Sequence, residues 1–318
     1  MRELINELFA RHLANPLLNT RTDAASLPKM NGELMMTTDG FTVQPLEFPG
    51  GNIGSLAIHG TVNDLAVAGA DPLYLSLNVF IEEGLEIALL ERIIQSLATA
   101  AAHAGVTVVT GDTKVVRRGE GGGLYLATTG VGLKPPGQNL GMEYIQPGDL
   151  ILVSGPVGDH GTAVMLAREQ FGMRGDLQSD AASVLPLTRA LRKFPGLRFM
   201  RDPTRGGLAS VMQEIHQASG FGLRLWQNAI PVRDPVTAVC EMLGYDPLYL
   251  ACEGRVVAVI AEDQAEQALA HWQDLPQGSE AALIGTITPS GQRVILETDL
   301  GGERVLEELE DDPLPRIC

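Results

Sequence analysis

The stretch Ile53–Ala68, IGSLAIHGTVNDLAVA, organises the first half of the chain. Its apolar residues and the glycine-rich turn Gly50-Gly51-Asn52 before it predict a helix. Apolar, strand-like segments flank it at Glu33–Val43 and Leu73–Ile81. Strands and helices alternate, but many strands have hairpin-like neighbours. This pattern predicts an α+β fold with mixed sheets rather than a doubly wound parallel sheet.

Outward from this stretch, periodicity and turn residues define the remaining elements. The strands Val106–Val116 and Leu124–Leu133 look paired around a polar, glycine-rich loop. The other predicted helices are Met1–Ala14, Leu85–Ala104, one starting at Thr162, Pro186–Arg192, Thr204–Ala218, Pro235–Leu243 and Ala265–Trp272, and the other predicted strands are Leu150–Ser154, Leu223–Trp226, Arg255–Ala261, Ala282–Thr286 and Arg293–Glu297. The turn Pro147-Gly148-Asp149 separates an N-terminal domain (1–147) from a C-terminal domain (148–308), and a tail follows (309–318).

The composition excludes several classes of protein. The chain has 318 residues, with 23 basic and 39 acidic side chains and a net charge of −16, which argues against nucleic-acid and anionic-membrane partners. No apolar run reaches the roughly 18 residues that a bilayer-spanning helix needs. Three cysteines without a CxxC pair favour a reducing cytoplasm over a disulfide framework or a zinc finger.

The third cysteine, Cys318, is the last residue, at the end of an acidic tail. Pro313 and Pro315 favour extended conformations before it. A thiol on such an arm is suited to carrying a group from one site to another. The alternative is a frayed terminus whose cysteine is incidental.

Four aspartates lie in turn-like contexts that suit metal binding. They are Asp39, Asp64, Asp112 and Asp202. Each alone is as well explained by helix capping or turn stabilisation. As a set, carboxylates from several loops are what Mg²⁺ needs when it bridges the phosphates of a nucleotide.

Two cationic segments accompany these acids. Lys114 follows Asp112 closely, where it suits the charge on a transferred phosphoryl group. Arg205-Gly206-Gly207, at the start of a predicted helix, offers a guanidinium and backbone N–H groups as an anion seat. Neither GxxxxGK[ST] nor a GxGxxG following a strand occurs, so the common nucleotide-binding folds are not indicated.

These segments belong to a set of motifs that resembles one family along essentially the whole chain. The motifs are TTDGF (37–41), PGGNIG (49–54), NDLAVAGADP (63–72), GDTKVV (111–116), SGPVGDHG (154–161), RDPTRGG (201–207), EGR (253–255) and PRIC (315–318). The chain resembles the HypE family of hydrogenase maturation proteins, carbamoyl dehydratases of the superfamily that includes aminoimidazole ribonucleotide synthetase and selenophosphate synthetase. The terminal PRIC is its specific signature.

The resemblance implies an ATP-dependent reaction on the terminal cysteine. In the family, a carbamoyltransferase, HypF, loads a carbamoyl group onto that thiol. ATP activates the thiocarboxamide oxygen, and loss of phosphate leaves a thiocyanate, whose cyano group passes to the iron of a [NiFe] hydrogenase precursor on a HypC–HypD scaffold. The family fold is an aminoimidazole ribonucleotide synthetase-like pair of α+β domains, the first contributing to a β-barrel at a homodimer interface.

The same resemblance assigns site residues. Cys318 is the modified residue, and Glu253 and Lys114 match positions implicated in dehydration, with Glu253 as a base. The positions matched to ATP are Asn63, Thr113, Lys114, Arg205, Gly206 and Gly207, and those matched to Mg²⁺ are Asp39, Asp64, Asp112 and Asp202. The family's HGxGG-type segment, which helps close the nucleotide site, is not found before the first helix. Either the start codon is assigned too late, or the protein lacks this lid, and only in the second case do we expect a lower ATP affinity or turnover.

Two alternatives stay open. One is another ATP-dependent synthetase of the superfamily, although a selenophosphate synthetase would carry a reactive residue near the N-terminus, and the first cysteine here is Cys240. The other is a non-catalytic assembly protein whose tail docks onto other maturation factors.

Overall fold

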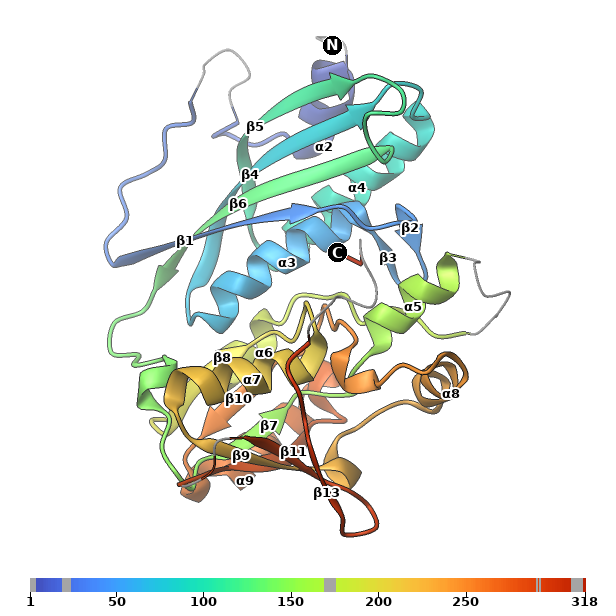
Figure 1. Cartoon of the computed structure of the whole chain (residues 1–318). Helices are drawn as coiled ribbons and strands as arrows, with labels where there is room; N and C mark the ends of the chain where they lie inside the picture. The colour runs from blue at the N-terminus through green and yellow to red at the C-terminus, as the bar shows by residue number, and fades with distance from the viewer. Residues whose placement is uncertain (1–3, 19–23, 169–175, 290, 292, 310–316) are drawn as a thin grey trace.

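A computed structural model describes the chain except for residues 1–3, 19–23, 169–175, 290, 292 and 310–316. Two β-sheets, one from each half of the sequence, are stacked with helices between and around them (Figure 1). The mixed-sheet α+β prediction is therefore confirmed. None of the helices in the described ranges is long and apolar enough to cross a bilayer.

The first sheet has four strands in the order β1-β6-β4-β5. Their bounds are β1 (Glu33–Phe41), β4 (Asp71–Glu82), β5 (Thr107–Val116) and β6 (Leu124–Lys134). β5 runs parallel to β4, whereas β6 is antiparallel to both β4 and β1. The predicted pairing of β5 with β6 is wrong because β4 lies between them. The long helix α4 (Ile87–Ala104) makes the crossover that a parallel β4–β5 pair requires.

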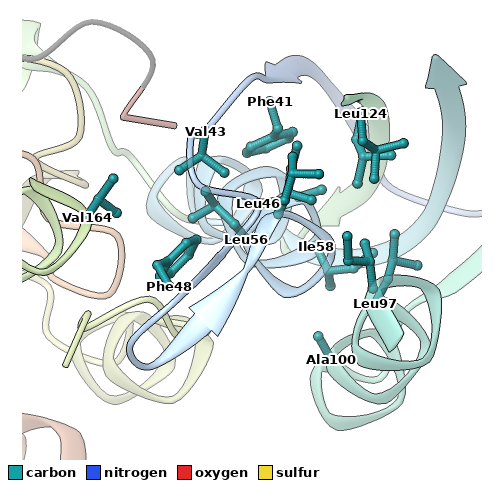
Figure 2. Close-up of a cluster of buried hydrophobic side chains, with 14 of the residues drawn as sticks. Phe41, Val43, Leu46, Phe48, Leu56, Ile58, Leu97, Ala100, Leu124 and Val164 are labelled. Atoms are coloured by element: carbon teal, nitrogen blue, oxygen red, sulfur yellow. The ribbon is translucent and has the colours of Figure 1, made fainter. Parts of the chain in front are cut away.

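One face of this sheet is covered by α3 (Ile53–Val67), which packs against α4. Asn52 caps α3 by accepting hydrogen bonds from the Gly54 and Ser55 N–H groups, and the Ser55 hydroxyl completes a capping box. Figure 2 shows part of the apolar cluster that results, in which Ile58 of α3 lies beside Leu97 of α4. This buried interface fixes where α3 presents its polar residues.

The second sheet has seven strands in the order β13-β12-β9-β11-β7-β10-β8. Its strands are β7 (Leu150–Val153), β8 (Leu197–Arg201), β9 (Gly222–Trp226), β10 (Val257–Ile260), β11 (Ala282–Thr288), β12 (Val294–Glu297) and β13 (Glu303–Val305). The helices of this half are α5 (Asp159–Ala167), α6 (Leu185–Leu191), α7 (Gly207–Ser219), α8 (Asp234–Leu243) and α9 (Glu262–Gln273). β8 and β13 were not predicted, because neither segment alternates apolar and polar residues strongly.

The N-terminal segment and the chain end complete the arrangement. Residues Ile5–Phe9 form a π-helical turn that continues into α2 (Ala10–Leu13), in place of one regular helix, and β2 (Glu47–Phe48) pairs with β3 (Gly51–Asn52). The C-terminus lies close to α3, between the two halves of the molecule (Figure 1). The predicted boundaries at 147 and 308 stay predictions, and most of the tail lies outside the described residues.

Candidate active site

A cavity of about 490 Å³ between the two halves is lined by six of the twelve predicted site residues. Asp39 and Asp64 reach it from the first domain, and Asp202 and Glu253 from the second. The terminal Cys318 lines the same cavity. Acids far apart in the sequence therefore share a space with the terminal thiol.

The first-domain acids are placed by the crossing of β1 over α3. The side chain of Asp39 lies on the face of β1 that faces the helix, where it accepts a hydrogen bond from the Gly40 N–H at 2.8 Å. Asp64, on α3, accepts one from the Thr37 hydroxyl at 2.7 Å. Gly60 lets the two elements approach, since a Cβ there would lie 2.9 Å from the Phe41 ring. Both carboxylates are half-buried and close enough for Asp64 to raise the pKa of Asp39, after burial itself.

The second-domain acids are almost fully buried. Burial, then repulsion from Asp64, raises the pKa of Asp202 from 3.8 to about 7. Burial, followed by repulsion from Asp202 and other carboxylates, raises the pKa of Glu253 well above its usual range. One oxygen of Glu253, Oε1, is buried and has no hydrogen-bond partner among the described residues. A protonatable carboxyl of this kind suits a general base, which is the role the sequence predicted for it.

The loop that carries Glu253 is held from behind by Asp180. The Asp180 carboxylate accepts hydrogen bonds from the Glu253 and Gly254 N–H groups, both at 3.2 Å. Arg255 lies 3.5 Å from the same carboxylate. A Cβ on Gly254 would collide with the Asp180 carbonyl oxygen, so this position requires glycine. Sequence reasoning missed Asp180, because no recognisable pattern surrounds it.

Asn63 was predicted to bind ATP, but its hydrogen bonds are directed elsewhere. Its Nδ2 group donates to the carbonyls of Ala182 and Glu253 at 3.0 and 3.1 Å. Its Oδ1 accepts from the Val184 N–H at 2.9 Å. The side chain is 1% exposed and joins α3 to the second domain. These contacts favour a positioning role for Asn63; ATP binding by it stays a prediction.

The last two residues are seated beside this cavity. Ile317 is 4% exposed within the main apolar cluster, and its carbonyl oxygen lies 2.8 Å from Nε2 of His160. A main-chain carboxylate oxygen of Cys318 accepts hydrogen bonds from the N–H and hydroxyl of Thr42, at 3.0 and 3.2 Å. The thiol is half-buried. These contacts give the resting position of the last two residues, whereas the mobility of the tail (309–318) stays a prediction, and Pro313 and Pro315 lie outside the described residues.

The predicted anion seat lies at the start of α7. Arg205 is exposed, lines the cavity, and lowers the pKa of Asp39 against the larger effect of burial. Gly206 and Gly207 both have positive φ, of 70° and 59°. A Cβ on Gly207 would lie 2.5 Å from the Leu250 carbonyl oxygen. The two glycines thus allow the turn into α7, and a phosphate contact from them stays a prediction.

Asp112, Thr113 and Lys114 are not in the cavity. They lie on β5, at the opposite edge of the first sheet from Asp39 on β1. The Lys114 ammonium lies 3.0 Å from Asp112, with side chains 63% and 59% exposed. A hydrogen bond from Lys114, then one from the Thr113 N–H, lowers the pKa of Asp112. Of the four aspartates predicted to bind the metal, one chain therefore brings together three, Asp39, Asp64 and Asp202, in the cavity, and Asp112 lies elsewhere.

The three cavity aspartates nevertheless fit a magnesium ion held together with phosphates. They offer hard oxygen ligands, and carboxylate repulsion adds to burial in raising the pKa of Asp39 and Asp202, so an added cation stabilises the charged forms of these two. Among the described residues, no three His, Cys, Asp or Glu side chains are arranged to hold an ion by themselves. This agrees with the habit of Mg²⁺ of keeping waters and substrate phosphates as ligands.

The other two cysteines are unsuited to the reaction. Cys240 is 2% exposed, and burial raises its pKa to about 11. Cys252 is fully buried, and its pKa is raised well above the usual value. Both are core thiols, as the sequence predicted.

Comparison with known proteins gives the same picture over the whole chain. Residues 21–134 and 146–297 match the N- and C-terminal domain models of AIR synthase related proteins. The protein named carbamoyl dehydratase HypE from Azotobacter vinelandii is 48% identical over 320 residues, which cover 100% of this chain and 94% of that one. The protein of that name from Escherichia coli K12 is 44% identical over 323 residues, covering 100% and 96%.

Solved structures agree. A crystal structure described as hydrogenase maturation protein HypE in complex with ATP superposes with a TM-score of 0.95 at 44% identity, covering 100% of this chain and 96% of that one. A HypE chain from a HypE–HypF complex superposes with a TM-score of 0.84 at 41% identity, covering 96% and 99%.

Proposed function

The chain belongs to the HypE family of carbamoyl dehydratases, which act in hydrogenase maturation, and we propose that it uses ATP to dehydrate a carbamoyl group on its own Cys318 thiol. One observation carries this proposal: Cys318 lines the same cavity as Asp39, Asp64, Asp202 and Glu253. Catalysis on a terminal residue requires that the residue and the catalytic acids share one space.

The chemistry balances with groups in this cavity. The oxygen of the S-carbamoyl group attacks the γ-phosphorus of ATP, and the bond to ADP breaks. Glu253, whose pKa is raised by burial and by neighbouring carboxylates, takes an N–H proton as the oxygen attacks. The carbon–oxygen bond then breaks, phosphate leaves with the carbamoyl oxygen, the second N–H proton is lost, and a thiocyanate remains on sulfur.

The remaining groups position the nucleotide. Asp39, Asp64 and Asp202 would hold a Mg²⁺ ion, which when bound neutralises charge on the ATP phosphates. Arg205, at the mouth of the cavity, supplies a guanidinium for the same phosphates. Asn63 and Asp180 hold the loop that carries Glu253.

A second copy of the chain is needed for the β5 residues Asp112, Thr113 and Lys114 to take part in ATP binding. The open face of the first sheet exposes Leu34 and Met36 of β1, at 57% and 75%, and Phe80 of β4, at 39%. Lys114 is paired in register with Phe80, so it shares that open face. An exposed apolar sheet face marks an interaction surface.

We infer a homodimer in which two such faces close a barrel. The unpaired edge strands are β1 in one copy and β5 in the other, and a closed barrel leaves no free edge. In that arrangement, Lys114 of the second copy lies beside the β1 edge that bears Asp39. The pair Asp112–Lys114 then completes the ATP site across the interface.

The partners follow from the family. We propose that HypF supplies the carbamoyl group, consistent with the HypE–HypF complex among the related structures, and that a HypC–HypD scaffold receives the cyano group in the cytoplasm. The balance of 23 basic to 39 acidic side chains argues against a nucleic-acid partner.

Intact-mass spectrometry of the C-terminal peptide tests the reaction. After loading of Cys318 with a carbamoyl group, addition of ATP and Mg²⁺ is expected to remove the mass of one water molecule and to release phosphate. Asp202→Asn is the matched control, which should accept the carbamoyl group but retain its oxygen. A wild-type peptide that keeps the carbamoyl mass after phosphate release would contradict the proposal.

A further inference from the structure

The chain end is held by three segments that are distant in sequence. The Ile317 side chain is buried in the main apolar cluster, and a main-chain carboxylate oxygen of Cys318 accepts hydrogen bonds from Thr42. The Ile317 carbonyl oxygen lies 2.8 Å from Nε2 of His160. His160, at the start of α5, is 0% exposed and has no role in the chemistry described above.

Geometry fixes the protonation of this histidine. A carbonyl oxygen only accepts, so Nε2 carries the proton and donates it to Ile317. Nδ1 then accepts from the Ser179 hydroxyl at 2.8 Å. The Ala181 N–H donates to the same Ser179 oxygen at 3.0 Å, which leaves the hydroxyl proton for the ring. The neutral ring is thus fully satisfied, and burial lowers the pKa of His160 in agreement.

The segment of Ser179 and Asp180 also supports the loop that carries Glu253. Ser179 contacts His160, and its neighbour Asp180 accepts from the Glu253 and Gly254 N–H groups. The Phe48 ring packs edge-on against His160, with centroids 5.4 Å apart and planes at 87°. The segment 179–180 therefore ties the seat of the tail to the loop bearing the proposed base.

We propose that His160 is a positioning residue: its Nε2–H group, in the tautomer fixed by Ser179, seats the Ile317 carbonyl and so places Cys318 in the cavity. The proposal rests on the proposed function, because the seated thiol is the one to be dehydrated. His160 acts through the main chain of Ile317 and does not touch the reacting atoms.

Two variants of equal polarity separate this role from a general structural one. The Nε2 group of glutamine in His160→Gln replaces the donor toward Ile317, whereas the shorter side chain in His160→Asn reaches Ser179 only. A carboxypeptidase digests the undocked chain end, so its rate follows the undocked fraction. Loss of one buried hydrogen bond is expected to raise the removal of Cys318 about tenfold in His160→Asn. His160→Gln should stay near the wild-type rate.

Equal digestion rates for the two variants and the wild type would overturn the proposal. If circular dichroism shows that His160→Asn does not fold, ring ¹⁵N NMR of His160 replaces the digestion test. The Nε2–H signal of the full chain is compared with that of a chain lacking Ile317 and Cys318. The signal is expected to shift, and an unchanged signal would refute the contact.

The digestion assay contains neither ATP nor a carbamoyl group, so it tests the role of His160 independently of the proposed reaction. A difference in digestion rate between His160→Asn and His160→Gln, together with no ATP-dependent water loss in the wild type, would support the role of His160 and refute the proposed function. Water loss at the wild-type single-turnover rate in His160→Asn would keep the function and refute the positioning role.

Discussion

The two groups of predicted metal-site acids sit in opposite environments. Asp39, Asp64 and Asp202 crowd together in a cavity, where burial and mutual repulsion raise the pKa of Asp39 and Asp202. Asp112 lies on an open sheet face, where Lys114 neutralises it and lowers its pKa. A cation bound in the cavity would stabilise the charged forms of Asp39 and Asp202. The charge of Asp112 is already balanced by Lys114, and we propose that this pair takes part in the site only when a second copy of the chain packs against it.

The contrast shows why residues of one predicted site need not meet within one chain. The cavity is built where two domains of one chain meet, so its acids are brought together by folding. Asp112 and Lys114 are separated from it by the width of a four-stranded sheet. We propose that association, rather than folding, completes the site.

The largest expected effect comes from Glu253→Gln on the cavity side. Removing a positioned base is expected to slow ATP-dependent water loss by about 10² to 10⁴-fold, while leaving carbamoyl loading of Cys318 intact. Single-turnover mass spectrometry of the C-terminal peptide measures this. As a control, Glu303→Gln alters a carboxylate on β13 that pairs with Arg224, away from the cavity, and should keep the wild-type rate. A Glu253→Gln rate within threefold of the wild type would remove Glu253 from the mechanism.

The second test uses pH on the metal- and nucleotide-free chain. Asp202 has a higher pKa folded, about 7, than the usual 3.8, so the folded state binds its proton more tightly. The contribution to the free energy of unfolding is therefore full below about pH 4 and declines as pH rises to about 7. With about 1.4 kcal/mol per pK unit, the decline approaches about 4 kcal/mol. Urea denaturation should show a much flatter profile in Asp202→Asn.

The matched control for pH is Asp112→Asn. The pKa of Asp112 is lowered in the folded chain, so its contribution has the opposite sign, being present at neutral pH and lost as pH falls. If Asp202→Asn and the wild type gave parallel profiles from pH 4 to 7, the cavity acids would not be coupled as described.

Mixed dimers test whether the exposed pair acts across an interface. Neither Lys114→Ala nor Asp202→Asn alone should be active. Random mixing gives half heterodimers with one intact site of two, so roughly a quarter of the wild-type activity should return. Phosphate release from carbamoylated chains measures it. Met36→Glu, placed on the open face in both chains, should abolish the recovery by preventing association. No recovery in a mixture shown to exchange subunits would place Lys114 outside the shared site.

The smallest expected effect is that of Cys318→Ala on stability. Cys318 is half-buried at the chain end, and the hydrogen bonds from His160 and Thr42 are made to main-chain oxygens that the alanine variant keeps. The free energy of unfolding should change by less than about 1 kcal/mol, while maturation is abolished. Cys240→Ala, in the core, is expected to cost more, about 1 kcal/mol or above. A larger loss for Cys318→Ala than for Cys240→Ala would make the terminal thiol a structural group.

Much of the architecture was accessible from sequence because local signals were strong. The Asn52 turn and the apolar run after it predicted α3 to within a residue of its end at Val67. The order of strands was not accessible. β5 and β6 follow one another and look like a hairpin, but α4 carries β5 across to the far side of β4, and local patterns do not encode that choice.

The site divides in the same way. Asp39, Asp202 and Glu253 were found from motifs, and the structure brings them together. Asn63 was matched by motif but is engaged with backbone carbonyls, a fact that only the packing of α3 against the second domain reveals. Asp180 and Thr42 were missed because their roles depend on contacts with main-chain groups distant in sequence.

The way the chain end is held also bears on what it can carry. His160 and Thr42 both bind main-chain oxygens of Ile317 and Cys318, so this recognition is indifferent to what is attached to sulfur. A bare thiol, a carbamoyl adduct and a thiocyanate can all occupy one seat with the same affinity from these bonds. If the proposed acceptor takes the product from Cys318, we expect it to release the chain end by competing for these main-chain contacts, because the chemical change at sulfur leaves them in place.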